Sequence, residues 1–190
     1  MSFSKFTILE SKPVLMPAEN IDTDQIIPAR FLKTTTRKGF GENLFHDWMY
    51  SKNGEKNPEF ILNKENGKGK ILVAGRNFGC GSSREHAALA PMYLGVKSVI
   101  VKSFARIHRA NLVNFGILPL TFTDENDYLV LDQGDSLELV DIKKQLKPGG
   151  ILVVHNRTKN KEIKVTHLLS SREIDILFAG GLLNYQAQKN

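Results

Sequence analysis

Cysteine is almost absent from this chain of 190 residues, which contains only Cys80. A single thiol excludes an intramolecular disulfide. By itself it also cannot supply the set of thiolates that an iron–sulfur cluster or a thiolate zinc site requires. Any metal chemistry connected with this protein must therefore use ligands from elsewhere.

Long apolar runs are also missing, and we expect no secretory leader. No stretch approaches the roughly 20 apolar residues that span a bilayer. The first ten residues hold one lysine and no sustained apolar segment, unlike a secretory signal. We therefore predict a soluble, cytoplasmic protein with no membrane attachment. The length suits one substantial core, and we expect a single domain over residues 1–190.

Aromatic residues do not alternate with basic ones, although the formal net charge is +6. The excess charge is spread over loops, among them residues 52–70 and 143–164. A platform for single-stranded nucleic acid needs aromatic side chains interleaved with basic ones. The charge therefore favours small anions or an acidic partner surface over nucleic acid as the main ligand.

The order of expected elements predicts an α/β fold. Apolar runs predict strands and periodic stretches predict helices, joined by short links; such alternation implies parallel strands with right-handed crossovers in the middle of the chain. Later strands are joined by turns and are expected to be antiparallel. Expected strands are 3–16 (broken by Pro13), 70–75, 97–102, 117–122, 136–142, 150–155 and 161–167; expected helices are 83–94, 104–115 (capped by Ser103) and 171–179.

The most informative segment runs from Gly75 to Leu89, where a glycine-rich turn opens into a predicted helix. This arrangement places Ser82, Ser83 and Arg84 at the N-terminus of the helix. The N–H groups of a first helical turn lack partners within the helix, and the dipole is positive there. Such an end is suited to binding a carboxylate or a phosphate.

Two other interpretations of this turn are weaker. Gly79 and Gly81 follow a strand as in a dinucleotide-binding motif, but Arg84 occupies the position of the third glycine. A nucleophilic pair of Cys80 and His86 would require His86 to fold back from the helix to the turn. A small side chain in a crowded turn is the favoured interpretation of Cys80.

In the third interpretation, Ser82 acts as a general base and the neighbouring Arg84 binds an anionic group of the substrate. Backbone N–H groups and an arginine can stabilise the alkoxide of Ser82, and Arg84 can hold a carboxylate through two hydrogen bonds. The structural alternative is that Ser82 caps the helix and Arg84 pairs with a surface acid. Residue types alone leave both interpretations open.

Several segments resemble a known family. Three of them resemble the mobile C-terminal domain of aconitase-type hydro-lyases: Asn77–Ala88, Lys102–His108 and Gly116–Leu120. Two more, Asn20–Leu32 and Thr36–Trp48, are similar to the free-standing small subunits of isopropylmalate dehydratases. The resemblance covers residues 3–125 and becomes faint beyond them.

The resemblance implies a swivelling β/β/α fold and a heteromer with a large subunit that carries a [4Fe-4S] cluster, with no metal bound by this chain. The implied reaction isomerises a small dicarboxylate, 2-isopropylmalate, to 3-isopropylmalate through isopropylmaleate, in leucine biosynthesis. Two alternatives stay open. One is the small subunit of a related homoaconitase or of a hydro-lyase that interconverts methylmalate and citraconate. The other is a non-catalytic module that binds anions or RNA.

The resemblance also assigns site residues. Ser82 matches the serine that takes a proton from substrate carbon, and Ser83 and Arg84 match its neighbours at the oxyanion and carboxylate site. Arg37 lies where the family places a further substrate-binding arginine. Asp24 corresponds to an acid that orients the active-site arginine; its alternative is an Asx-type turn residue.

The remaining chemistry-bearing residues show no clear pattern. We expect residues 33–41 to form a mobile loop that closes over the substrate. The histidines have no metal-ligand spacing, and a surface or satisfied-core position is expected for each of His46, His108, His155 and His167.

Overall fold

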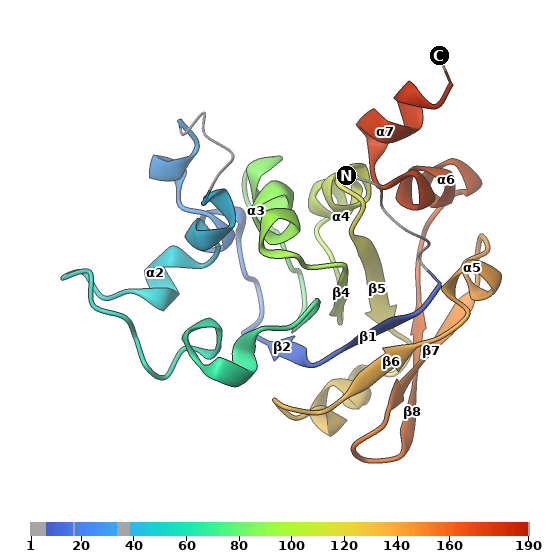
Figure 1. Cartoon of the computed structure of the whole chain (residues 1–190), viewed down its shortest axis with the longest axis horizontal. Helices are drawn as coiled ribbons and strands as arrows, with labels where there is room; N and C mark the ends of the chain where they lie inside the picture. Colours follow the sequence, from blue (N-terminus) through green and yellow to red (C-terminus); the bar gives the residue numbers. More distant parts are fainter. Residues whose placement is uncertain (1–6, 17, 34–38, 190) are drawn as a thin grey trace.

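An eight-stranded mixed sheet forms the centre of the computed structural model, which describes residues 7–16, 18–33 and 39–189 (Figure 1). The strands lie in the order β1-β6-β7-β8-β5-β4-β3-β2. Their bounds are Leu9–Ser11 (β1), Pro13–Leu15 (β2), Ile71–Ala74 (β3), Ser98–Val101 (β4), Leu118–Phe122 (β5), Leu137–Leu139 (β6), Ile151–Asn156 (β7) and Lys161–Thr166 (β8).

Strands β2 to β5 form the parallel half of the sheet. Two helices make its crossovers, α3 (His86–Leu94) between β3 and β4, and α4 (Arg106–Asn114) between β4 and β5. Every residue of β3 and β4 is buried, as expected for parallel strands that are covered on both faces. The prediction of a parallel centre is confirmed.

Strands β6, β7 and β8 form the antiparallel half, which joins the parallel half where β8 pairs with β5. Buried and less buried residues alternate along β6 and β7, because one face of these strands covers the core. The prediction of later antiparallel strands is therefore confirmed as well.

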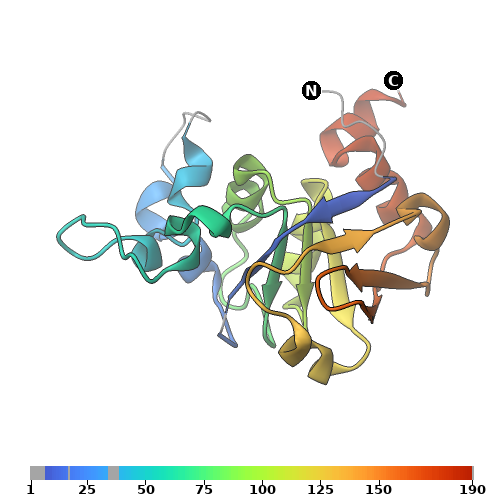
Figure 2. The same ribbon diagram turned by 60° about the horizontal axis from the view of Figure 1, so that its bottom comes forward.

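The N-terminal strand segment supplies the strands at both ends of the sheet. β1 pairs antiparallel with β6 and β2 pairs parallel with β3, so the two strands lie at opposite ends of the sheet although only Lys12 separates them. The strand expected over residues 3–16, with a break at Pro13, is divided between two partners, and the division falls at Lys12. Figure 2 shows this segment running from the side of β3 across to β6.

Side chains from alternate positions along the strands enter two hydrophobic clusters. Ile71 and Val73 of β3 contribute to one cluster, which also contains buried residues of helix α6 (Ser171–Ala179). Leu72 and Ala74 contribute to the other, together with the buried alanines of α3. The alternation follows from the two-residue period of a strand, and it fixes α3 and α6 on the two faces of the sheet.

Short helices complete the fold, and several of them differ from the prediction. For residues 20–28 the sequence predicts a polar turn followed by a short apolar run. The structure has helix α1 (Thr23–Ile26) there instead, because Asp22 and Gln25 form a capping box. The spacing of Leu44, Phe45, Trp48 and Met49 also predicts a short helix, which α2 (His46–Met49) confirms. Helices α5 (Ile142–Gln145) and α7 (Leu182–Ala187) were not predicted, whereas α6 was. Segments of 3-10 helix occupy Ala29–Phe31, Phe40–Asn43, Ile61–Asn63, Glu65–Gly67 and Glu125–Val130.

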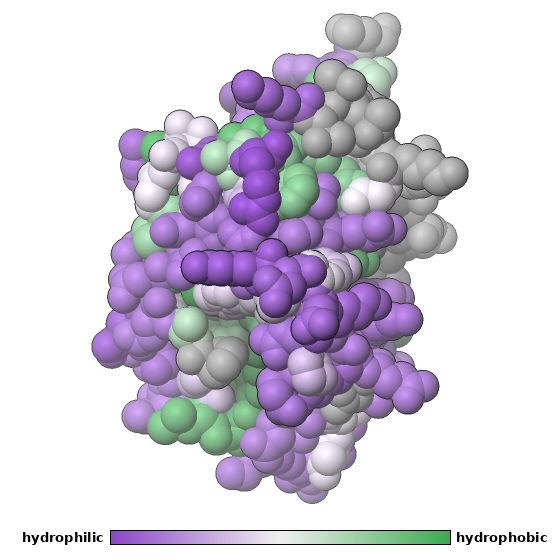
Figure 3. Space-filling model, turned by 90° about the vertical axis from the view of Figure 1, so that its left-hand side faces the viewer, coloured by the Kyte–Doolittle hydropathy of each residue, from purple (hydrophilic) through white to green (hydrophobic). Residues whose placement is uncertain are grey.

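The side of the molecule formed by α2 and the segment around residues 50–70 is largely hydrophilic. Figure 3 shows hydrophobic residues there only in small groups between charged and polar ones. Among the described residues, no helix is long and apolar enough to cross a membrane.

Candidate active site

The carboxyl ends of β2, β3 and β4 meet at one edge of the sheet, which is where ligands bind in open α/β folds. The loop over residues 75–85, here called the serine loop, leaves β3 at this edge. Its backbone is bonded on both sides: Gly79 N–H donates to the Ile21 carbonyl (2.8 Å), and Phe78 N–H donates to the Ser103 carbonyl (3.0 Å). These bonds to two neighbouring segments fix the position of the loop.

Three residues with left-handed backbone conformations give the serine loop its shape. Asn77, Gly79 and Gly81 have φ angles of 54°, 78° and 87°. At Gly79 a side chain is excluded for a second reason, because a Cβ atom there would lie 2.1 Å from Cγ of His108. The loop backbone therefore rests directly on the imidazole ring of His108.

Helix α3 begins later than predicted. Its first residue is His86, so Ser82, Ser83 and Arg84 precede the helix and do not form its first turn. The sequence predicts these three residues at the N-terminus of a helix over 83–94; they do immediately precede the helix, but its predicted start at residue 83 is wrong. The N–H groups of Ser83, Arg84 and Glu85 find no acceptor among the residues the structure describes, which leaves them free for an anion.

Arg84 and Asp24 form an ion pair across the site, although 60 residues separate them in the sequence. The second interaction of Asp24 is with the N–H of Ala29 (3.0 Å). The hydrogen bond from Arg84 holds the pKa of Asp24 below its usual value. The Asx-type role considered for Asp24 belongs instead to Asp22, which accepts from the N–H groups of Asp24 and Gln25.

Thr23 makes a further contact from α1 that the sequence did not reveal. The side chain is buried, and its hydroxyl donates to the carbonyl of Ser82 at 2.9 Å. Helix α1 thus holds the serine loop through Thr23 and the arginine through Asp24. The hydroxyl groups of Ser82 and Ser83 are exposed, and neither has a hydrogen-bond partner in the described part of the chain.

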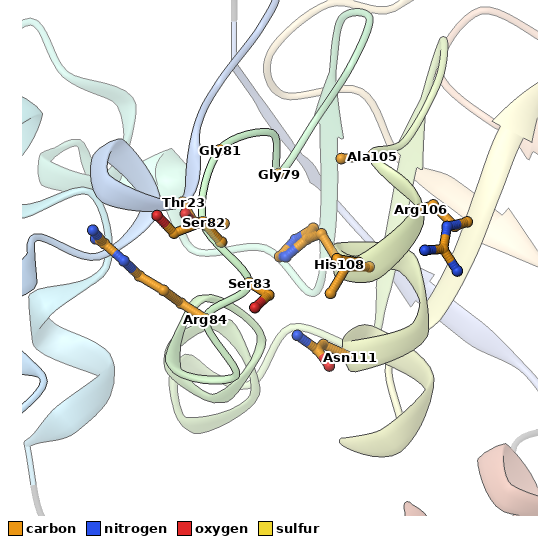
Figure 4. Close-up of a pocket in the computed structure, with 11 residues that line it drawn as sticks. Thr23, Gly79, Gly81, Ser82, Ser83, Arg84, Ala105, Arg106, His108 and Asn111 are labelled. Carbon is orange, nitrogen blue, oxygen red and sulfur yellow. Dashed lines mark hydrogen bonds between the residues drawn. The ribbon is translucent and has the colours of Figure 1, made fainter.

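A cavity of about 200 Å³ lies between the serine loop and α4 (Figure 4). This volume is below the roughly 300–1,000 Å³ of sites for drug-sized ligands, so the cavity suits a small molecule or part of one. Figure 4 shows the side chains of Ser83, His108 and Asn111 directed toward this space, whereas Arg84 extends to the other side, toward α1. No acidic residue is among those that line the cavity.

His108 departs from its predicted role. It is 2% exposed, and neither ring nitrogen has a hydrogen-bond partner among the described residues, so the expectation of a surface or satisfied-core histidine is wrong here. Burial lowers its pKa to about 4. The ring packs edge-on against Phe78, with the ring centroids 5.2 Å apart.

The buried, neutral state of His108 predicts a pH dependence of stability. An unfolded histidine titrates near 6.5, so between this pH and about 4 the unfolded chain binds a proton that the folded chain does not. Stability from this group is therefore complete above pH 6.5 and is lost as the pH falls toward 4, by about 3 kcal/mol. Urea unfolding at a series of pH values measures this, with His108→Met as the control expected to lack the same component. An NMR titration that finds His108 protonating near pH 6.5 would contradict the prediction.

Comparison with known proteins decides the family. The sequence profile of the aconitase C-terminal domain matches residues 3–125, which include the serine loop, α1 and α4. The chain belongs to the aconitase C-terminal domain family. A crystal structure of 3-isopropylmalate dehydratase from Methanocaldococcus jannaschii has the same fold: it is 34% identical, with a TM-score of 0.73, and the match covers 96% of this chain and 95% of that one.

Curated relatives carry matching names. The 3-isopropylmalate dehydratase small subunit of Christiangramia forsetii is 54% identical over 121 residues, which are 64% of this chain and 59% of that protein. The protein of the same name from Anaeromyxobacter dehalogenans is 46% identical over 139 residues, 73% of each chain. The matched region spans about three fifths of the Christiangramia relative and of a further relative from Cytophaga hutchinsonii.

Two further predictions for this member of the aconitase C-terminal domain family concern the segment around Arg37 and the pair Cys80 and His86. Arg37 lies outside the described residues, as does most of the expected loop over residues 33–41. Within that loop, Phe40 is described and is buried in the core. A catalytic pair of Cys80 and His86 is not formed, since the Cys80 thiol donates to the Asn20 carbonyl (3.3 Å) and His86 packs beside Phe40.

The described residues do not fit an iron–sulfur cluster. No group of three or more histidine, cysteine, aspartate or glutamate side chains within the described ranges is placed to hold a metal ion. Cys80, the single cysteine, is bonded to a backbone carbonyl.

Proposed function

We propose that this chain is the small subunit of a 3-isopropylmalate dehydratase, a hydro-lyase that works as a heteromer with a large subunit. The observation that carries the proposal is Arg84, held by Asp24 beside the exposed hydroxyl of Ser82 at the edge of a cavity without acidic residues. The names of the relatives support the same activity. The whole chain, acting as one unit in the cytoplasm, is the form we expect to assemble.

In the proposed reaction, Ser82 acts as general base. Its alkoxide takes a proton from a substrate carbon, the C–H electron pair forms the double bond of isopropylmaleate, and the hydroxyl leaves the adjacent carbon. The same groups work in reverse when water adds back at the other carbon. A [4Fe-4S] cluster on the large subunit would supply Lewis acidity toward the leaving hydroxyl.

The other residues of the site bind and orient the dicarboxylate. The free N–H groups of Ser83, Arg84 and Glu85 supply positive electrostatic potential beside Ser82, which favours its alkoxide. Arg84 is suited to pair with a substrate carboxylate, and we infer that Arg37 supplies a second cation. Asp24 fixes the guanidinium of Arg84.

Reconstitution tests the function. The chain is mixed anaerobically with a cluster-loaded isopropylmalate dehydratase large subunit, and the ultraviolet absorbance of isopropylmaleate is followed. Activity that requires both chains is the expected result. A folded complex that acts on homoaconitate or a methylated malate and not on isopropylmalate would contradict the proposed substrate. Tight RNA binding by the chain alone, with a steep salt dependence, would favour a non-catalytic module.

Asp24→Asn is expected to raise KM for isopropylmalate about tenfold, with a smaller effect on kcat. Loss of the carboxylate frees the Arg84 side chain. Substrate binding must then restrict this side chain, and the lost conformational entropy weakens binding. Steady-state kinetics of the complex measures the change. Glu138→Gln is the matched control, because it removes the carboxylate of another arginine pair, Arg157–Glu138, in the antiparallel half of the sheet. Equal effects of the two variants on KM would contradict the role of Asp24.

A further inference from the structure

The wall of the cavity that faces the serine loop is formed by α4. His108 and Asn111 are three residues apart on this helix and therefore share one face. Both line the cavity, and both side chains are directed toward Ser83 (Figure 4). The proposed reaction assigns no task to either residue.

His108 is an unsatisfied polar group at this wall. A neutral imidazole has one N–H donor and one acceptor nitrogen, and both nitrogens here are buried without a partner among the described residues. Buried polar groups in native proteins are nearly always hydrogen-bonded, and an unmade bond is costly. A protein that keeps this arrangement beside a cavity gains if a ligand in the cavity completes the missing bond.

The surroundings of the cavity select the chemistry of that ligand. None of the lining residues is an aspartate or a glutamate, and the lining side chains of Arg84 and Arg106 extend away from the space between Ser83 and Asn111 (Figure 4). On the opposite wall, the N–H groups of Ser83 and Arg84 have no acceptor among the described residues. Donors thus predominate on both sides, and a carboxylate is an acceptor with two oxygens that can be bonded from both.

We propose that His108 and Asn111 form a carboxylate-binding wall, in which an imidazole N–H and the side-chain amide of Asn111 bind one carboxylate of a ligand held against the serine loop. This inference rests on the proposed function for the identity of the ligand, a hydroxy-dicarboxylate, and it adds two substrate-binding residues on α4 to the site. Gly79 allows the arrangement, because its missing side chain lets the loop lie directly on His108.

The first test uses NMR on the full chain labelled with ¹⁵N-histidine. Malate, a hydroxy-dicarboxylate, is expected to shift the ring nitrogens of His108, whereas its neutral diamide is not. His155, which lies on β7 and does not line the cavity, is the internal reference. Unchanged His108 resonances with malate up to about 50 mM, beyond the range of ordinary weak binding, would overturn the proposal.

The second test uses Asn111→Asp, which keeps the size of the side chain but places a negative charge in the wall. Malate binding to the chain, and isopropylmalate KM in the complex, are each expected to weaken at least tenfold. Asn114→Asp is the matched control, because Asn114 lies on the same helix and does not line the cavity; less than a twofold change is expected. Equal behaviour of the two variants would overturn the proposal.

A third variant separates hydrogen bonding from packing. His108→Gln keeps an N–H donor and is expected to retain more malate affinity than His108→Met, which has none. If malate binds through this wall but no complex converts isopropylmalate, the proposed function fails while the wall stands. If isopropylmalate is converted and the Asn111 and His108 variants bind as the wild type does, the wall fails while the function stands.

Discussion

Ser82→Ala is expected to lower kcat of the complex by a factor of about 10²–10⁴, the usual contribution of a general base, while KM changes only a few-fold. The hydroxyl is exposed at the cavity, so its removal deletes the group that takes the proton without disturbing a packed neighbour. The carbonyl of Ser82, which accepts from Thr23, is retained in the variant. The loop therefore keeps its position, and the loss falls on the chemical step.

Three measurements decide whether the loss is chemical. Thermal melting and assembly with the large subunit should match those of the wild type, and malate should inhibit with unchanged affinity. Ser136→Ala serves as the matched control, because this serine precedes β6 and lies away from the cavity. A Ser82→Ala complex with a kcat within tenfold of the wild type would show that another group takes the proton.

Gly79→Ala is expected to destabilise the protein by about 4 kcal/mol. A side chain costs about 1–2 kcal/mol in the left-handed region, and overpacking adds about 1–3 kcal/mol. Here the new Cβ would overlap the buried ring of His108, and loop bonds to Ile21 and Ser103 on either side oppose a shift. Chemical denaturation of the full chain measures the difference.

Gly54→Ala provides the matched control. Gly54 has nearly the same backbone conformation, with φ of 80°, but a Cβ there has nothing within 4 Å. Its cost should therefore be limited to backbone strain, about 1 kcal/mol. In a His108→Ala background, where the ring is gone, the cost of Gly79→Ala should fall toward the same value. Equal costs for Gly79→Ala and Gly54→Ala in the wild-type background would show that the loop is not held against His108.

The parts of the fold that were predicted correctly are those with strong local signals. Helix α6 has the predicted bounds, because Ser170 and Glu173 form a capping box at its start and Gly180 ends it in a left-handed conformation. Strands β3, β4 and β5 were recognised from apolar runs between glycine-containing turns. In each case the local preference and the tertiary environment agree.

The errors occur where distant segments override local preference. Residues 83–85 suit a helix by composition, but α3 starts at His86, and the carbonyl of Ser82 accepts a hydrogen bond from the distant Thr23. Ser103 was expected to cap α4; it accepts instead from the N–H of Asn77 (2.8 Å), and Ala105 occupies the cap position without a side-chain bond. Neither partner could be identified from spacing along the chain.

The site shows the same division. The motif around Ser82 and Arg84 and the resemblance it carries were sufficient to place both residues and to pair Arg84 with Asp24. Thr23 and His108 were missed as members of the site. Thr23 stands next to Asp24 in a segment already singled out, so this position was a usable signal. The unsatisfied state of His108 depends on how Gly79 packs against it, which only the folded chain reveals.

The division of the N-terminal strand between two partners has a consequence for biosynthesis. Leu9–Leu15 is synthesised before its partners: β2 needs Ile71–Val73, and β1 needs Leu137–Leu139, which is made much later. Such pairings have high contact order, and closing long loops is slow and entropically costly. We therefore expect the nascent chain to keep its first strand unpaired until most of the polypeptide has been synthesised. The same linkage makes this short segment sensitive to proteolytic trimming, since cutting it would release both ends of the sheet at once.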